Sequence, residues 1–102
     1  MKMVIAYVDA EAFEPIRVHL IELGIASLSM IQASGSVPDA IAKGSYRGIT
    51  LETHVRPKTR IECVVGDDLV EQVVESVLEL ATDRRFVVVL DVVSAHPMTT
   101  VA

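Results

Sequence analysis

The order of apolar periods along the chain constrains the fold most. A β-rich run at residues 2–8 precedes apolar residues at offsets of three and four, namely Phe13, Ile16, Leu20 and Leu23. That spacing predicts the buried stripe of a helix. The alternation returns in the second half, where a β-rich run at 61–65 precedes a second stripe of Val70, Val73, Val74, Val77, Leu78 and Ala81. Each half of the chain therefore predicts a strand followed by a helix.

Two further strands complete the pattern. Small polar and apolar residues alternate from 27 to 33, which is the period of a strand, and residues 86–93 form an apolar run. The order β-α-β-β-α-β predicts an α+β, ferredoxin-like fold with a four-stranded antiparallel sheet. A length of 102 residues fits one domain spanning 1–102, with an unassigned tail at 94–102.

Turn and cap residues set the expected helix ends. Pro15 would break a helix interior, so the first helix is expected to begin close to Phe13 and to stop at Gly24. Asp68 and Glu71 have the spacing of a capping pair for the second helix.

Residues 36–57 show no sustained period and contain Pro38, Gly44, Gly48 and Pro57. They predict a long loop, and loops of this length are usually functional. The chain carries a net charge of −5, yet residues 36–60 hold five basic residues against two acidic ones. Such a segment can attract small anions, or it can be an ordinary solvated loop, while the overall acidity argues against nucleic-acid binding.

The last strand predicts an oligomer. Residues 86–90 are apolar at odd and even positions alike, and these positions point to opposite faces of a strand. This is expected of a strand buried on both faces. Two helices can cover only one face of a four-stranded sheet. A symmetric oligomer is the expected cover for the other face.

Other features exclude several classes of protein. Cys63 is the only cysteine, so no internal disulfide and no C-x-x-C metal site is expected, and a buried thiol is predicted. The apolar run at 86–93 is too short to span a bilayer, and the first residues lack a signal-peptide pattern. A cytoplasmic location is expected.

Short phrases along the chain resemble the PII family of nitrogen and carbon signal proteins. They are Glu22-Leu23-Gly24-Ile25, Tyr46-Arg47-Gly48, Pro57-Lys58, Ile61-Glu62-Cys63-Val64-Val65 and Asp67-Asp68-Leu69-Val70. The resemblance implies a non-enzymatic homotrimer that binds effectors between subunits. It also implies that the long loop is the T-loop, which contacts a regulated protein such as a membrane transporter or a metabolic enzyme.

The sequence also departs from the family. Leu51 stands where many members carry the tyrosine that is uridylylated, so this modification is not expected. Residues 82–85 lack the glycines of the family's phosphate loop, and the tail has Ala95-His96-Pro97 in place of an arginine pair. The chain thus resembles members with a shortened loop. We expect no cofactor, and as effector AMP, ADP, a cyclic nucleotide or a bicarbonate-like anion in preference to ATP.

The resemblance also implies the site residues. Lys58 is expected either to contact an anion or to be an ordinary surface lysine. Gly35 is expected to turn the chain out of the second strand or to allow close approach to a ligand. Arg84 and Arg85 are expected either to replace the phosphate loop or to pair with the helix dipole. The full ligand-binding set comprises Gly35, Ser36, Val37, Lys58, Val64, Arg84 and Arg85. Partner contacts are expected from Lys43, Tyr46, Arg47 and Arg56.

Alternatives remain open. One is a loop-mediated adaptor with no small ligand. Another is a small phosphatase-type enzyme on the same fold, although the segment after the first strand, Asp9-Ala10-Glu11, lacks the arginine and glycines of such a phosphate loop. An RNA-binding module would need exposed aromatic pairs, which residues 61–65 and the last predicted strand lack.

Overall fold

The computed structural model describes residues 1–25, 27–42, 49–81 and 85–96, with the backbone alone at 37–42 and 49–54. Its elements are β1 (Lys2–Val8), α1 (Ala10–Glu22), β2 (Ser29–Ala42), β3 (Ile49–Val65), a 3₁₀ turn η1 (Asp67–Leu69), α2 (Val70–Leu80) and β4 (Phe86–Asp91). The predicted βαββαβ order and antiparallel sheet are confirmed.

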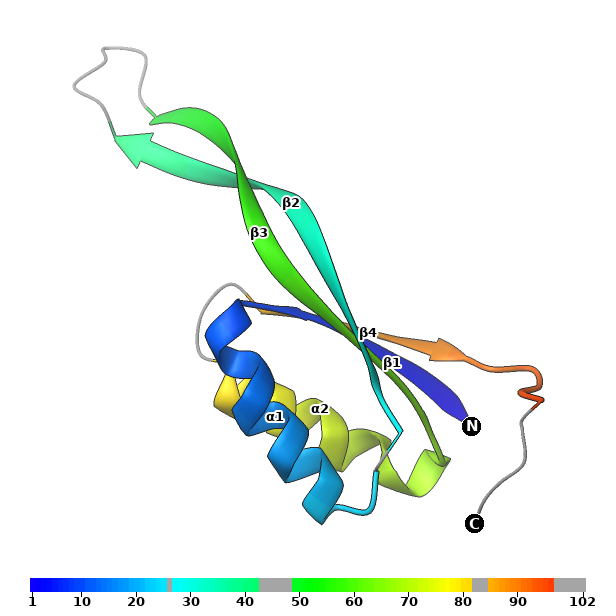
Figure 1. Cartoon of the computed structure of the whole chain (residues 1–102). Helices are drawn as coiled ribbons and strands as arrows, with labels where there is room; N and C mark the ends of the chain where they lie inside the picture. The colour runs from blue at the N-terminus through cyan, green and yellow to red at the C-terminus, as the bar shows by residue number, and fades with distance from the viewer. Residues whose placement is uncertain (26, 43–48, 82–84, 97–102) are drawn as a thin grey trace.

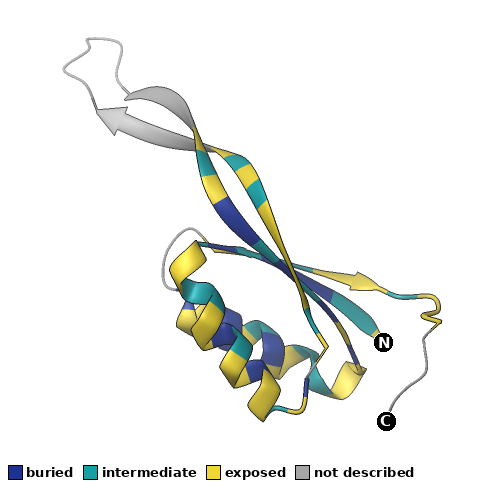
Figure 2. Ribbon diagram, in the orientation of Figure 1, coloured by how far each residue is buried: buried dark blue, intermediate teal, exposed yellow. Residues whose placement is uncertain are grey.

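The strands lie in the order β2-β3-β1-β4, and all neighbours are antiparallel. Both helices pack on one face of this sheet (Figure 1). Strand residues of one parity meet them in the core, as Figure 2 shows in dark blue. The buried apolar core comprises Val4, Ala6, Val8, Ile16, Leu20, Ile25, Ile61, Cys63, Val65, Val73, Val77 and Ala81.

The predicted stripes largely match the core, with one error. Ile16 and Leu20 of α1 and Val73 and Val77 of α2 are buried. Leu78, which we assigned to the second stripe, is 41% exposed. It follows Val77 directly, and 100° of rotation along the helix turns it away from the sheet.

The first helix begins earlier than predicted. It starts at Ala10, so Pro15 lies inside it. Pro15 is exposed, and the carbonyl deprived of its helical N–H donor can be satisfied by water on that side. The predicted end is confirmed, because Gly24 follows the C-cap residue with a φ of +96°.

The predicted capping pair of the second helix is wrong. The chain passes through η1 before α2 begins at Val70, and no side-chain cap bond is formed at the start of either element within the described chain. The extra turn moves Asp68 away from the N-cap position of α2, which Leu69 occupies.

The region predicted as a loop is mostly a paired ribbon. β2 and β3 continue in register from Ser34 opposite Pro57 to Ala42 opposite Ile49. We call residues 34–42 and 49–57 the arm. β1 ends opposite Thr59, so beyond that point β2 and β3 run on alone and project from the body (Figure 1). The backbone ladder requires no alternation of apolar side chains, and the periodicity therefore missed it.

The predicted turn at Gly35 is also wrong. Gly35 lies within β2, opposite Arg56, and the chain leaves the sheet without bending back. Lys43, Tyr46 and Arg47, which come between β2 and β3 in the sequence, lie outside the described residues.

Candidate functional site

An ion pair lies at the base of the arm. Val8, the last residue of β1, pairs with Thr59, so Asp9, the next residue along the chain, comes beside Lys58 of β3. The Lys58 ammonium Nζ donates a hydrogen bond to Asp9 Oδ1 over 3.2 Å. The lysine side chain is only 7% exposed and the aspartate side chain 33%.

Gly35 lies against the stem of this lysine. A Cβ atom built on Gly35 would be 3.6 Å from Lys58 Cγ, which is ordinary contact. The structure thus brings together two of the residues predicted to bind a ligand. Ser36 follows, exposed and opposite Val55, and the backbone of Val37 pairs with that of His54.

Arg85 lies at the same end of the sheet. It precedes Phe86, which pairs with Tyr7 near the end of β1, and it is exposed. Among the four residues predicted to contact a partner, Arg56 is the one that the structure describes. It lies opposite Gly35 and is half-buried at the base of the arm. Arg84 lies outside the described residues.

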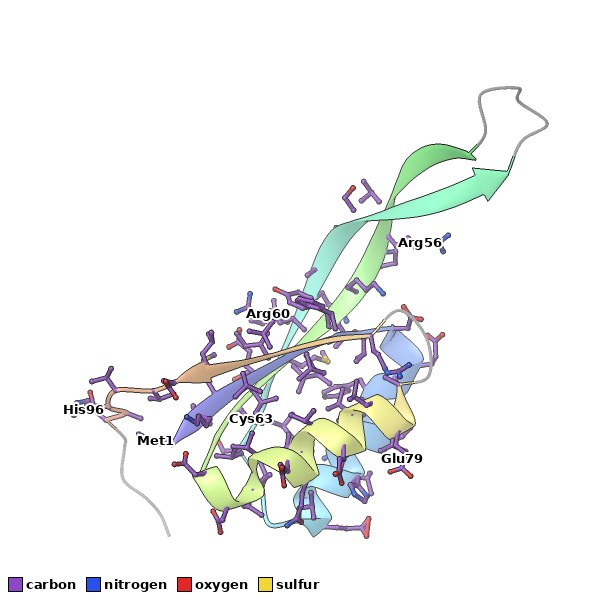
Figure 3. The ribbon with its side chains drawn as sticks, turned by 180° about the vertical axis from the view of Figure 1, so that it is seen from behind. Met1, Arg56, Arg60, Cys63, Glu79 and His96 are labelled. Atoms are coloured by element: carbon purple, nitrogen blue, oxygen red, sulfur yellow. The ribbon has the colours of Figure 1, made fainter. Side chains whose placement is uncertain are left out.

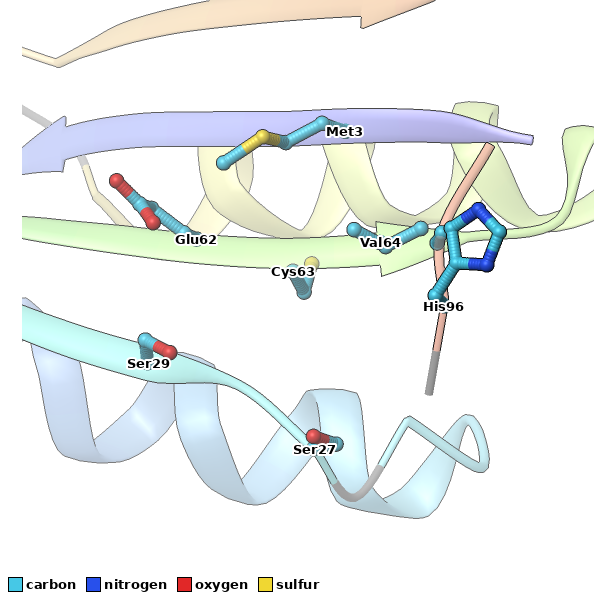
Figure 4. A pocket seen from close by; sticks show the side chains of 8 residues that line it. Met3, Ser27, Ser29, Glu62, Cys63, Val64 and His96 are labelled. Atoms are coloured by element: carbon cyan, nitrogen blue, oxygen red, sulfur yellow. The ribbon is translucent and has the colours of Figure 1, made fainter. Parts of the chain in front are cut away.

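Val64 is found elsewhere, beside Met3 near the opposite end of β3. It lies six positions further along β3 than Lys58, or roughly 20 Å. Val64 lines a cavity of about 360 Å³ that lies between the strands and the tail (Figure 4). The lining residues are Met3, Ser27, Ser29, Glu62, Cys63, Val64, Ala95 and His96.

The sheet face opposite the helices carries an apolar surface, which we call the open face. The ladder registers place on it Met3, Ile5, Tyr7, Val64, Phe86, Val88 and Leu90. No described helix covers this face, and Phe86 is 61% exposed. β4 is therefore half uncovered in the single chain, as expected if an oligomer completes its burial.

A cluster on the open face contains two charged side chains that pair with each other. Arg60 pairs with Glu62 at 2.5 Å, donates to the Tyr7 hydroxyl oxygen at 3.0 Å, and lies 5.6 Å from the centre of the Tyr7 ring. Figure 3 shows Arg60 on the side of the sheet away from the helices and Cys63 on the helix side. This pairing lowers the cost of covering the face with another protein surface.

Comparison with known proteins assigns the family. The model of the family "Nitrogen regulatory protein P-II" matches residues 1–97. The chain belongs to the P-II family. Nitrogen regulatory protein P-II 2 of Methanothermobacter thermautotrophicus is 31% identical over 81 residues, which cover 79% of this chain and 70% of that protein. Nitrogen regulatory protein GlnK2 of Haloferax mediterranei is 27% identical over 81 residues, covering 79% of this chain and 66% of that one.

Solved structures agree on the fold. The Bacillus subtilis GlnK-ATP complex superposes on this P-II chain with a TM-score of 0.74 at 23% identity, covering 90% of this chain and 84% of that one. The names of the family and of its curated relatives describe regulatory proteins and no catalysed reaction. The predicted family and non-enzymatic class are confirmed.

Sequence reasoning missed part of the site in this P-II chain. Ser27, Ser29, Glu62 and His96 line the cavity, and none of them was predicted to do so. They come from β3, from the start of β2 and the segment before it, and from the tail, which no spacing along the sequence connects. The alternation of Ser27 and Ser29 was a signal, but it indicated only a strand.

Proposed function

We propose that this P-II chain is a homotrimeric regulator that binds a small anionic effector between subunits and acts on a target through its arm. The observation that carries the proposal is the placement of two partial sites at opposite ends of one open face. The Lys58 end supplies positive charge, and the Val64 end supplies a cavity. One chain cannot bring them together across roughly 20 Å.

A closed ring of copies removes this difficulty. In a head-to-tail contact, the Lys58 end of one copy can meet the Val64 end of the next, and three such contacts close a ring. The same packing would bury the exposed side chains of Phe86 and Leu90. Contiguous apolar surface of this kind commonly marks a protein interface.

The effector would be an adenine nucleotide or a bicarbonate-like anion. A cavity of about 360 Å³ falls within the range usual for small-molecule sites. GlnK of Bacillus subtilis, which shares the fold, has been solved as a complex with ATP. Residues 82–85 contain no glycine for a backbone phosphate cradle, which favours AMP, ADP or a cyclic nucleotide over ATP in this chain.

The arm would carry the signal. It makes the molecule 61 Å long against 27 Å and 23 Å in the other directions, so it reaches far beyond the body. Arg56 at its base, together with Lys43, Tyr46 and Arg47 from the sequence between its two strands, would offer charged and aromatic groups to a transporter or an enzyme. None of the described helices has the length and apolarity to cross a bilayer, and a cytoplasmic location stays a prediction.

The second candidate is an adaptor with no small ligand. Lys58, which an anion would need, already has a carboxylate partner in the isolated chain. Native mass spectrometry of the protein purified from its own cells tests both candidates, because it gives the oligomer mass and any retained ligand together. A trimer with bound nucleotide supports the regulator, a trimer with no added mass favours the adaptor, and a monomer overturns the shared-site model.

A further inference from the structure

Asp9 occupies an unusual position. It is the N-cap residue of α1, where an aspartate normally accepts hydrogen bonds from the first backbone N–H groups of the helix. Here its side chain makes no cap bond within the described chain, while its backbone carbonyl accepts from the Ala12 N–H at 3.0 Å. The carboxylate is directed to Lys58 instead.

We infer that Asp9 is an internal competitor for the anion site at Lys58, so that an effector must displace its carboxylate or bind beside it. This inference rests on the proposed function. An ammonium group has three N–H donors, and the Asp9 contact uses one of them while placing a negative charge where an anionic ligand would bind. Either mode of binding is weakened by this carboxylate.

The burial of the two side chains indicates how the site opens. Lys58 is 7% exposed, so solvent has little access to its ammonium, whereas Asp9 is 33% exposed. Rotating the carboxylate outward into water removes its contact with Nζ and leaves the backbone unchanged. The backbone of Lys58 is held opposite Ala33 in the β2–β3 ladder, and its stem passes near Gly35.

A dependence on ligand charge follows. Repulsion between Asp9 and the ligand grows with the negative charge near Lys58, so ATP suffers more than ADP, and ADP more than AMP. Asp9 thus acts as a specificity residue that selects against highly charged anions. This effect of Asp9 is distinct from the lack of glycines at residues 82–85, because replacing the Asp9 side chain alone would remove it.

Calorimetry with AMP, ADP and ATP tests the inference on full-length wild type, Asp9→Asn and a matched control, Glu11→Gln. Asparagine keeps the shape of aspartate and is also a favourable N-cap residue, so the variant retains the helix start. Glu11 is exposed in the first turn of the same helix, and its variant makes the same change in charge. Light scattering on each sample confirms an equal oligomer mass.

We expect Asp9→Asn to bind ADP about ten-fold more tightly than wild type, with a larger gain for ATP and a smaller one for AMP. Glu11→Gln should shift these affinities less than about two-fold. Wild-type binding with no gain in Asp9→Asn would overturn the inference and leave the proposed function standing. Equal gains for all three nucleotides would remove the charge-selection role. No binding by wild type or Asp9→Asn would overturn the inference and the proposed nucleotide ligand together.

Discussion

The aromatic rings of Tyr7 and Phe86 lie 6.4 Å apart between centroids and are tilted by 42° to one another. The two residues are direct partners in the β1–β4 ladder, on the open face. Tilted aromatic pairs at this separation are favourable beyond the area that they bury. The pair therefore adds an exposed aromatic surface to the open face, which suits contact with another copy.

Phe86→Asp should dissociate the proposed trimer. The substitution places a charge on a surface that the oligomer would bury, and an unpaired buried charge is strongly unfavourable. Size exclusion with light scattering should show a mass near that of one chain. Leu78→Asp, on the exposed side of α2, is the control and should keep the mass of the oligomer. An unchanged mass for Phe86→Asp would exclude this face as the interface.

Lys58→Ala should weaken the binding of ADP by about ten-fold or more, since a charge-assisted contact contributes roughly 1.5 to 3 kcal/mol. Titration calorimetry measures the change. Arg17→Ala removes a cation from the exposed ion pair with Glu14 on α1 and should leave the affinity unaltered. Equal losses in the two variants would point to a general effect of charge rather than to a site.

Backbone amides of the arm should exchange faster than those of β1. Beyond Thr59 the ribbon has two strands and no third one beside it, and two-stranded ribbons are marginally stable in water. Hydrogen exchange followed by mass spectrometry compares peptides from 49–57 with peptides from 2–8. Equal protection would mean that the arm is supported by contacts that the single chain does not show.

Gly24→Ala should lower the free energy of unfolding by about 1 to 2 kcal/mol, because a φ of +96° is strained for a residue with a Cβ. No atom crowds this position, so the loss would be a backbone effect. Gly35→Ala is the matched control: its Cβ would make ordinary contact and its place in a strand suits alanine. Denaturant unfolding should separate the two variants. Similar losses in the free energy of unfolding would contradict a backbone effect specific to Gly24.

Cys63 should react slowly with thiol reagents in the native protein. Burial raises the pKa of this thiol above its ordinary value, which reduces the thiolate fraction at pH 8. Because the pKa of the thiol is raised in the folded state, its contribution to the free energy of unfolding is fully present below the pKa of the unfolded state. That contribution is lost as the pH rises through the pKa of the folded state. Ellman's reagent should label the thiol fully only after unfolding. Rapid labelling of the native protein would show that the core opens readily near β3.

Local sequence determined the order of the strands and helices and most of the core. The offsets of Ile16 and Leu20, and of Val73 and Val77, predicted the buried helix faces because side-chain direction repeats with the helix turn. Gly24 marked a helix end because only glycine readily adopts its backbone conformation. The missing cover over β4 was also predictable, since two helices cannot cover both faces of a sheet.

The tertiary structure alone decided the arm and the site. Cross-strand pairing of residues 34–42 with 49–57 joins backbone groups, which every residue type except proline offers in the same form. Asp9 and Lys58 lie 49 residues apart and meet because the β1–β3 register sets Val8 opposite Thr59. No period or spacing in the sequence encodes that register. It is fixed by the packing of one sheet face against both helices, and a slip of one residue would turn every core side chain outward.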